Sequence, residues 1–195
     1  SSLPDLVVNG VNVVPGSGLK SGDNFTVQWN VRNDGAAATS GSFTDRVLVR
    51  NTANSQVILN TTLAYAEIDL GNGPIAPGTQ RARQLGLTLP QGATGAGSFE
   101  VVVTTDTFNQ IAEANVGNTA EANNSATANF NSSLAPYPDL RVIDLATTPA
   151  SGWSPGTAVT IQWAITNSGP AITSTSWVDR VTVRNDSRSV VLMTT

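Results

Sequence analysis

The sequence predicts an all-β protein, an immunoglobulin-like antiparallel β-sandwich in a tandem repeat whose second copy is incomplete. Three observations predict this fold. Apolar and polar residues alternate along several short segments, Gly, Pro and Asn separate those segments, and the opening of the chain occurs a second time. No segment carries a helical apolar stripe with caps, and a closed β-barrel is the second choice of architecture.

The predicted strands follow one another along the first copy. In NFTVQWNVRN, residues 24–33, apolar and polar side chains alternate, which is the period of a half-buried strand. The same alternation predicts strands within 42–51 and 97–106. Turn signals such as NDGAA, GNGPIAPGT and LPQGATGAG separate the segments. The remaining strands are predicted at 4–14, 56–63, 79–88, 108–113 and 125–130.

The repeat becomes visible when the chain is aligned with itself so that Pro138 matches Pro4. Residues 4–61 then align with 138–195 without a gap, and 26 of the 58 pairs are identical, which indicates duplication of a whole domain. We therefore expect a first domain at 1–131, a Pro-containing linker at 132–137 that favours extended polyproline geometry, and the N-terminal part of a second domain at 138–195.

Two tryptophans occupy equivalent positions in the two copies. Trp29 lies on the apolar side of its strand, and Trp163 lies at the same place in TIQWAITN. The simplest interpretation places both indoles in a core between two facing sheets, and ligand stacking is the less favoured alternative.

The second copy repeats only residues 4–61 and stops before the equivalents of residues 62–131. Its inner face would lack a partner, which forfeits about 1.5–3 kcal/mol for each large apolar side chain. In sum this is comparable with the whole stability of a domain. We therefore do not expect Thr195 to end an independently folding protein. Three explanations stay open: a longer chain, a remnant, or donation of the missing strands by another copy.

Composition excludes several function classes. A net charge of -4, with one Lys and nine scattered Arg, provides no basic footprint for nucleic acid. The absence of Cys and His removes disulfides, the commonest general base and the commonest transition-metal ligand. No apolar run reaches the ~20 residues of a membrane-spanning helix, so no membrane insertion is expected.

The richest polar stretch is TTDTFNQIAEANVGNTAEANNS, residues 104–125. Oxygen ligands suit a hard cation such as calcium, for which Asp106, Glu113 and Glu121 are the candidate ligands. The spacing differs from that of the helix-flanked calcium loop, and Asn clusters ordinarily form turns through bonds to the backbone. Structural turns are therefore favoured, calcium remains the alternative, and no other cofactor is expected.

Catalysis has weak support. Asp45 and Asp179 recur at matched positions before an Arg, and a carboxylate dyad of Asp45 with Asp106 would need a cleft and a raised pKa. An Asp that accepts backbone N–H bonds or pairs with a nearby Arg explains the same pattern. No G-x-S-x-G elbow or phosphate-binding loop occurs, so we expect no enzyme.

Several motifs together resemble a known family. They are PDLVV and PDLRV, GDNFTVQWNVRNDG and GTAVTIQWAITNSG, FTDRVLV and WVDRVTV, APGTQ, and VVVTTDTFNQIAEANVGNTAEANNS. They are similar to the CARDB domain, a bacterial module named for its relation to cell adhesion, over positions 1–131 and the opening of a second copy. The resemblance implies an immunoglobulin-like sandwich, found as tandem repeats in large secreted or surface-attached proteins, without activity of its own.

We therefore predict a structural or adhesive repeat segment of a large extracellular or cell-surface bacterial protein, as a stalk, adhesin spacer or filament subunit. The expected partners are further copies of the repeat in cis or in trans, up to a homopolymer, and a surface glycan or protein. The alternative is an accessory or carbohydrate-binding module of a secreted hydrolase, but only Tyr65, Tyr137 and Trp153 are expected to be exposed for sugar binding, and they are not clustered.

Overall fold

The computed structural model describes residues 2–194, which form twelve β-strands and two short 3-10 helices. The chain divides into two compact units, unit 1 at Ser1–Ala135 and unit 2 at Pro136–Thr195. No helix within the described residues is long and apolar enough to cross a membrane.

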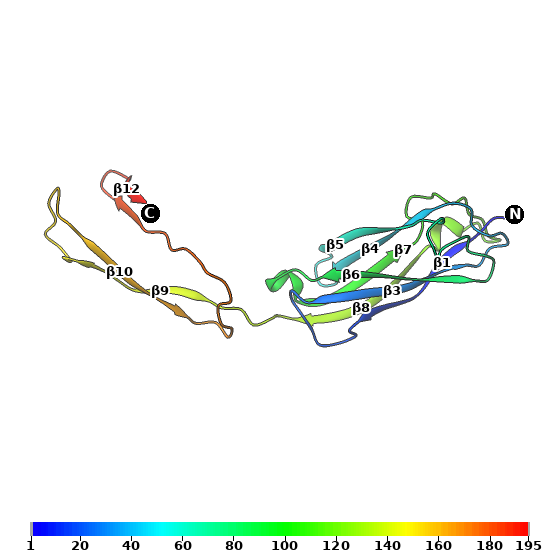
Figure 1. Ribbon diagram of the computed structural model, residues 1–195, viewed down its shortest axis with the longest axis horizontal. Coiled ribbons are helices and arrows are strands. Elements are labelled where there is room, and N and C mark those ends of the chain that lie inside the picture. The colour runs from blue at the N-terminus through cyan, green and yellow to red at the C-terminus, as the bar shows by residue number, and fades with distance from the viewer. Residues whose placement is uncertain (1, 195) are drawn as a thin grey trace. The chain divides into compact units, whose positions relative to one another are not determined.

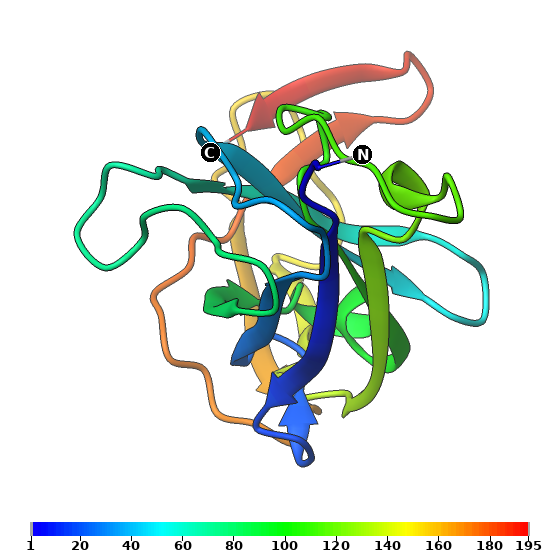
Figure 2. The same ribbon diagram turned by 90° about the vertical axis from the view of Figure 1, so that its right-hand side faces the viewer.

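Unit 1 is a sandwich of two separate sheets, so it is not the closed barrel considered as second choice (Figures 1 and 2). The smaller sheet has the order β1-β3-β6, with β1 at Leu6–Val14, β3 at Asn24–Asn33 and β6 at Gln80–Thr88. The larger sheet has the order β2-β8-β7-β4-β5, and only its β2–β8 pair is parallel. Its strands are β2 (Leu19–Lys20), β4 (Phe43–Asn51), β5 (Val57–Tyr65), β7 (Gly97–Thr104) and β8 (Ser125–Ser133).

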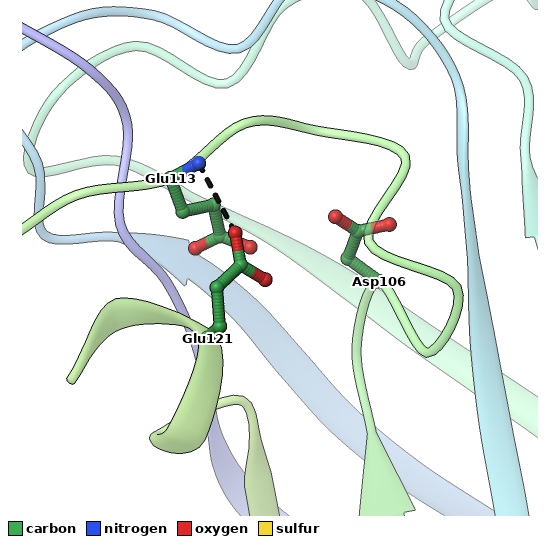
Figure 3. A group of neighbouring side chains, drawn as sticks. All are labelled: Asp106, Glu113 and Glu121. Atoms are coloured by element: carbon green, nitrogen blue, oxygen red, sulfur yellow. Dashed lines mark hydrogen bonds between the residues drawn. The ribbon is translucent and has the colours of Figure 1, made fainter.

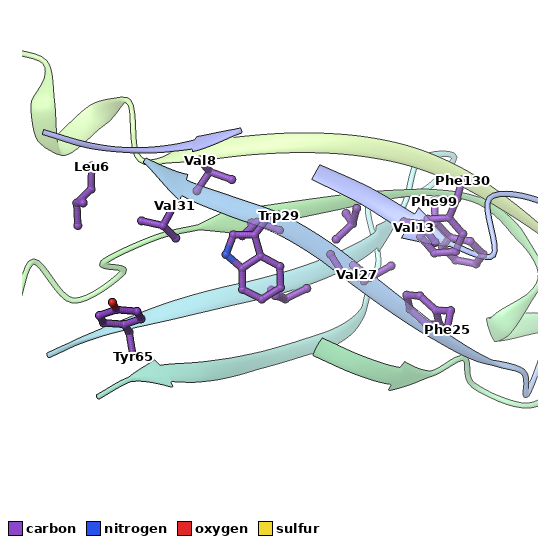
Figure 4. Close-up of a cluster of buried hydrophobic side chains, with 14 of the residues drawn as sticks. Leu6, Val8, Val13, Phe25, Val27, Trp29, Val31, Tyr65, Phe99 and Phe130 are labelled. Atoms are coloured by element: carbon purple, nitrogen blue, oxygen red, sulfur yellow. The ribbon is translucent and has the colours of Figure 1, made fainter. Parts of the chain in front are cut away.

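The core lies between these sheets, as the alternation predicts. The even-numbered side chains of β3 face outward or are half-buried, while its apolar residues point toward β4 and β7 (Figure 4). Trp29 is 1% exposed, which confirms it as a core tryptophan. The buried apolar residues of the three strands are Phe25, Val27, Trp29, Val31, Phe43, Val47, Val49, Phe99, Val101 and Val103.

The predicted strands of the first copy agree closely with the observed ones, with one exception, and only the short β2 has no predicted counterpart. The strand predicted at 108–113 is wrong, because these residues form a loop. The Asp106 carboxylate accepts the backbone N–H groups of Gln110 and Ile111, at 2.7 and 2.8 Å, so these groups are not available to a strand ladder. Ile111 is nevertheless buried, which explains the misleading apolar signal.

Unit 2 consists of two antiparallel ribbons. β9 (Leu140–Thr148) pairs with β10 (Thr160–Asn167), and β11 (Thr182–Asn185) pairs with β12 (Val190–Thr194). When Pro138 is matched to Pro4, each ribbon has the register of its counterpart in unit 1, and each register shift falls at the equivalent place. The repeated sequence therefore forms the same local pairings.

The ribbons of unit 2 differ from unit 1 in burial. Trp163 is 36% exposed where Trp29 is 1% exposed, and Trp177 is 50% exposed where Phe43 is 1% exposed. The expectation that Trp163 lies between facing sheets is wrong for the described residues. The physical reason is that residues 138–194 include no counterpart of β6, β7 or β8, the strands that complete both sheets in unit 1.

Candidate functional site

The loop that joins β7 to β8, residues 105–124, carries the predicted cation ligands. Asp106, the second residue of this loop, has a left-handed backbone conformation, with φ of 43°, and is 1% exposed. Its two carboxylate oxygens accept the N–H groups of Gln110 and Ile111, and its carbonyl accepts the N–H of Asn109 at 2.9 Å. The side chain therefore closes a tight turn, as the structural interpretation of this stretch predicts.

Two further carboxylates lie beside Asp106 (Figure 3). Glu113 is half-buried and accepts hydrogen bonds from the Leu6 backbone N–H and from Asn124 Nδ2, the latter at 3.0 Å. Glu121 lies on the 3-10 helix η2 (Ala120–Ala122), and its Oε1 accepts the Glu113 N–H at 3.3 Å. One oxygen from each of the three carboxylates lies within 4.8 Å of the others.

The charges of this carboxylate cluster are not balanced by a cationic side chain. None of the ion pairs among the described residues involves Asp106, Glu113 or Glu121. The pKa of Glu113 is raised to about 7, because burial raises it most, the hydrogen bonds from Leu6 and Asn124 lower it, and the neighbouring Glu121 and Asp106 carboxylates raise it. Close carboxylates of one sign oppose each other's ionisation. Either a proton or a bound cation would relieve the repulsion.

Asn124 contacts the cluster through its side-chain amide nitrogen. Its side chain is 4% exposed and contacts Glu113 through Nδ2, while its Oδ1 has no hydrogen-bond partner. A buried amide oxygen without a partner is unusual. Because Nδ2 rather than Oδ1 faces Glu113, Asn124 acts on the cluster as a hydrogen-bond donor.

The dimensions of the cluster suit one calcium ion. Calcium binds six to eight oxygens at about 2.3–2.6 Å, so ligand oxygens around one ion lie up to about 5 Å apart. The 4.8 Å limit that encloses the three carboxylates falls within this span. The donor set contains only oxygens, which is the preference of a hard cation.

Other polar residues of the loop bind elsewhere. The side-chain amides of Asn115 and Asn123 donate to the carboxylate of Asp5, at 3.2 and 3.0 Å. Asp5 is 6% exposed and is a functional candidate that the sequence analysis missed. The signal available for it is the repeated Pro-Asp-Leu at residues 4–6 and 138–140. These contacts attach the loop to the start of β1.

Asp45 has a structural environment. Its carboxylate is buried and accepts bonds from Trp29 Nε1 at 3.2 Å, Thr105 Oγ1 at 2.7 Å and Arg83 Nε at 3.0 Å. Burial raises the pKa of Asp45, and these donors lower it. The cationic partner is Arg83 on β6 rather than the adjacent Arg46. Asp45 is 0% exposed, so its carboxylate offers no face to a substrate.

Two of the three aromatic residues considered for sugar binding are less exposed than expected, since Tyr137 is half-buried and Tyr65 is buried. The expectation that Tyr65 is exposed is wrong. It is 0% exposed, because its ring stacks on Phe43 at 4.6 Å between centroids and its hydroxyl donates to the Gly73 carbonyl at 2.7 Å. Trp153, in unit 2, is 49% exposed.

Similarity to known proteins indicates the family of this chain. The family model CARDB matches residues 3–128. The chain is similar to the CARDB domain of the PF1109 protein from Pyrococcus furiosus, solved by crystallography in complex with di-metal ions, with 20% identity and a TM-score of 0.47 over 69% of this chain and 98% of that one. The solution NMR structure of that domain has 19% identity and a TM-score of 0.43 over 69% and 100% of the two chains.

A third similarity is to the β-glucosidase EmGH1 from Erythrobacter marinus, with 14% identity and a TM-score of 0.40 over 66% of this chain and 15% of that chain. None of the curated proteins compared with the chain matches it significantly.

Proposed function

The chain belongs to the CARDB family of adhesion-related modules, and from this premise we propose that it is a load-bearing spacer segment of a large extracellular bacterial protein. In this role two repeats follow one another, and tension enters each through its ends. One observation carries the proposal: both ends of unit 1 are fastened to its sandwich by hydrogen bonds from several segments.

The N-terminal end of unit 1 is held by the β7–β8 loop. The Leu6 N–H donates to Glu113, the Ala114 N–H donates to the Pro4 carbonyl at 3.0 Å, and Asp5 receives the two Asn amides described above. A pull on residue 4 therefore acts on the loop as well as on β1. Hydrogen bonds loaded together resist force better than bonds that open one at a time.

The C-terminal end of unit 1 is held by β2. Ser132 and Ser133 pair in parallel with Leu19 and Lys20, the Ser21 N–H donates to the Ser133 carbonyl at 2.8 Å, and the Ala135 N–H donates to Ser21 Oγ at 2.9 Å. These bonds continue the ladder of β8 up to the linker. Such fastening supports a role in which the domain must stay folded while its ends are pulled.

The proposed location is tested on cells of the source bacterium. Antibodies raised against the chain are applied to intact and to lysed cells, with a cytoplasmic protein as the control antigen. We expect intact cells to be labelled and the label to disappear after brief treatment with external protease. Labelling that requires lysis would contradict the proposal.

The proposed mechanical role is tested by single-molecule stretching of the full chain between its termini. Forced unfolding reports the unfolding rate rather than the equilibrium stability. We expect Asn123→Ala, which removes one fastening bond of Asp5, to lower the unfolding force of unit 1. Gln84→Ala on β6 is the control. Equal forces for all variants would argue against fastening by the loop.

We further propose that the carboxylate cluster binds calcium and thereby strengthens the fastening of β1. The close approach of Asp106, Glu113 and Glu121 supports this, because one oxygen from each lies within 4.8 Å of the others and no ion pair among the described residues balances their charge. A bound ion would neutralise the cluster and hold Glu113 against the Leu6 N–H. A ligand that binds only the folded state at 100 times its Kd stabilises that state by about 2.7 kcal/mol.

Calorimetric titration and thermal unfolding with calcium and with chelator test the site. Glu121→Gln changes an exposed ligand with little risk to folding, and Glu100→Gln, which removes the same charge from β7, is the matched control. We expect calcium to raise the Tm of the native chain and of the control, and to affect Glu121→Gln much less. A transition unchanged by calcium in the native chain removes the ion from the proposal.

A further inference from the structure

Unit 2 presents a groove of about 690 Å³ lined by apolar side chains from both of its ribbons. We call this surface the open face. It combines two indoles with aliphatic side chains, and its lining residues Val142, Leu145, Trp153 and Trp163 are between 36% and 69% exposed. Ile161 and Val181 also line it.

Unit 1 shows what an equivalent surface contacts. In the alignment of the two repeats, the open face corresponds to core positions, among which Val8, Val27 and Val47 are buried. In unit 1 the β1 part of this surface contacts β7 and β8, from which Phe99 and Phe130 enter the same core (Figure 4). Unit 1 therefore shows which kind of strands would fit the open face of unit 2.

The hydrogen-bonded pair of Trp163 and Asp179 further restricts which partner would fit the open face. Trp163 Nε1 donates to Asp179 Oδ2 at 3.0 Å, as Trp29 Nε1 donates to Asp45. Asp45 also receives the guanidinium of Arg83 and the hydroxyl of Thr105, which belong to β6 and to the end of β7. Residues 138–194 include no counterpart of these two donors. Asp179 lines the groove and is exposed.

The free strand edges define where a partner strand would lie. In unit 1, β6 adds to the edge of β3 and places Arg83 opposite Trp29, while β7 adds to the edge of β4. The corresponding edges of β10 and β11 have no strand beside them among the described residues. Unpaired strand edges are templates for an added strand.

We propose that the open face is a docking surface for a polypeptide segment that adds strands of the β6 and β7 kind, with an Arg opposite Trp163 and a hydroxyl donor, both bonded to Asp179. The apolar groove provides affinity, and Asp179 selects the register, because a strand shifted by one residue would turn its Arg to the other face. A second open face fits less well, since two faces in contact leave both strand edges unpaired. The inference does not depend on the proposed spacer role, because it rests on the equivalence of the two repeats.

The test extends the full chain after Thr195 by a copy of residues 62–131, which continues the second repeat in register. Three of the four tryptophans, Trp153, Trp163 and Trp177, are exposed in the present chain. We expect the extension to shift their emission to the blue, to reduce quenching by acrylamide severalfold, and to protect the amides of 160–167 from exchange. An extension of scrambled sequence is the control.

Two variants test the selecting role of the carboxylate. Asp179→Asn, and separately Met in place of the Arg of the extension that corresponds to Arg83, should each speed exchange of these amides by roughly tenfold or more, because a buried charge loses its partner. Combining the two changes should cost less than the sum of the single effects. Variants that exchange like the parent overturn the assignment of Asp179.

Two other results would overturn the proposal. One is that the correct extension leaves quenching of the tryptophans unchanged. The other is that the unextended chain sediments as a dimer with its tryptophans already protected, because the occupant would then be a second open face. A monomer with quenchable tryptophans is the expected result for the unextended chain.

Discussion

Units 1 and 2 form the same local structure in two different environments. Asn33 and Asn167 each close the turn after their strand with three hydrogen bonds to the backbone. The partners in matching order are Asp5, Gly35 and Ala37 in unit 1, and Asp139, Gly169 and Ala171 in unit 2. The corresponding distances are 3.1, 2.9 and 2.7 Å, and 2.9, 3.0 and 2.6 Å.

The two environments differ in the contacts that residues distant in the sequence make. Asn33 is 0% exposed and donates a fourth bond to the Ile75 carbonyl, at 2.8 Å, whereas Asn167 is exposed. The difference teaches that residues close in sequence specify register, turns and the indole–carboxylate bond, while burial requires strands that arrive later. Stability should therefore respond to the same substitution very differently in the two units.

The largest contrast is expected at the tryptophans. Trp29→Ala empties a core position and should destabilise unit 1 by about 3–5 kcal/mol, whereas Trp163→Ala should cost less than about 1 kcal/mol because its indole is 36% exposed. Native-state hydrogen exchange measures both units in one sample. Trp29→Phe should recover part of the loss. Equal losses in the two units would show that unit 2 has a core of its own.

A smaller contrast is expected at the two carboxylates. Asp45→Asn leaves the Arg83 guanidinium, whose side chain is only 10% exposed, without a counter-ion, and should destabilise unit 1 by about 2–3 kcal/mol. Asp179→Asn should change unit 2 by less than about 0.5 kcal/mol, since surface substitutions seldom do more. Urea unfolding followed by exchange gives both values. A large effect of Asp179→Asn in the unextended chain would reveal a partner already bound to that residue.

The same distinction between local and distant contacts explains which parts of the fold the sequence predicts. Period-two alternation predicts β3 because the side chains of a strand alternate between core and solvent, and Trp29 follows from it. The segment around Ile111 shows the limit, since a buried apolar residue also occurs in a loop that Asp106 closes through side-chain bonds. Local composition could not distinguish these two cases.

The candidate site was predictable in part for the same reason. Asp106, Glu113 and Glu121 lie on one short loop, so composition alone identifies them as candidate ligands, and the fold brings them within 4.8 Å. The contacts of Asp5 with Asn115 and Asn123 join segments 110 and 118 residues apart. Nothing in either segment alone specifies that pairing, because it depends on where two sheets place their ends.

One substitution should act in the same way in both units. A Cβ at Gly35 would lie 2.4 Å from the Asp5 backbone N, and one at Gly169 would lie 2.3 Å from the Tyr137 backbone O. Both backbones must move, so Gly35→Ala should cost about 1–3 kcal/mol, and Gly169→Ala should speed exchange of the Ser168 amide. Gly86→Ala, with no atom within 4 Å, is the control. If Gly169→Ala leaves exchange of the Ser168 amide unchanged, the two turns do not respond to this substitution in the same way.

The smallest effect is expected where the two repeats differ in charge only on the surface. Arg32 pairs with Asp34, with side chains 46% and 44% exposed, while the equivalent positions in unit 2 hold Thr166 and Ser168. Exposed ion pairs contribute about 0–1 kcal/mol, so Arg32→Ala should shift the stability of unit 1 by no more than about 0.5 kcal/mol and less still in high salt. Urea unfolding at two salt concentrations measures this. Since unit 2 forms the same turn without the pair, a loss several times larger and insensitive to salt would mean that Arg32 supports unit 1 through more than its charge.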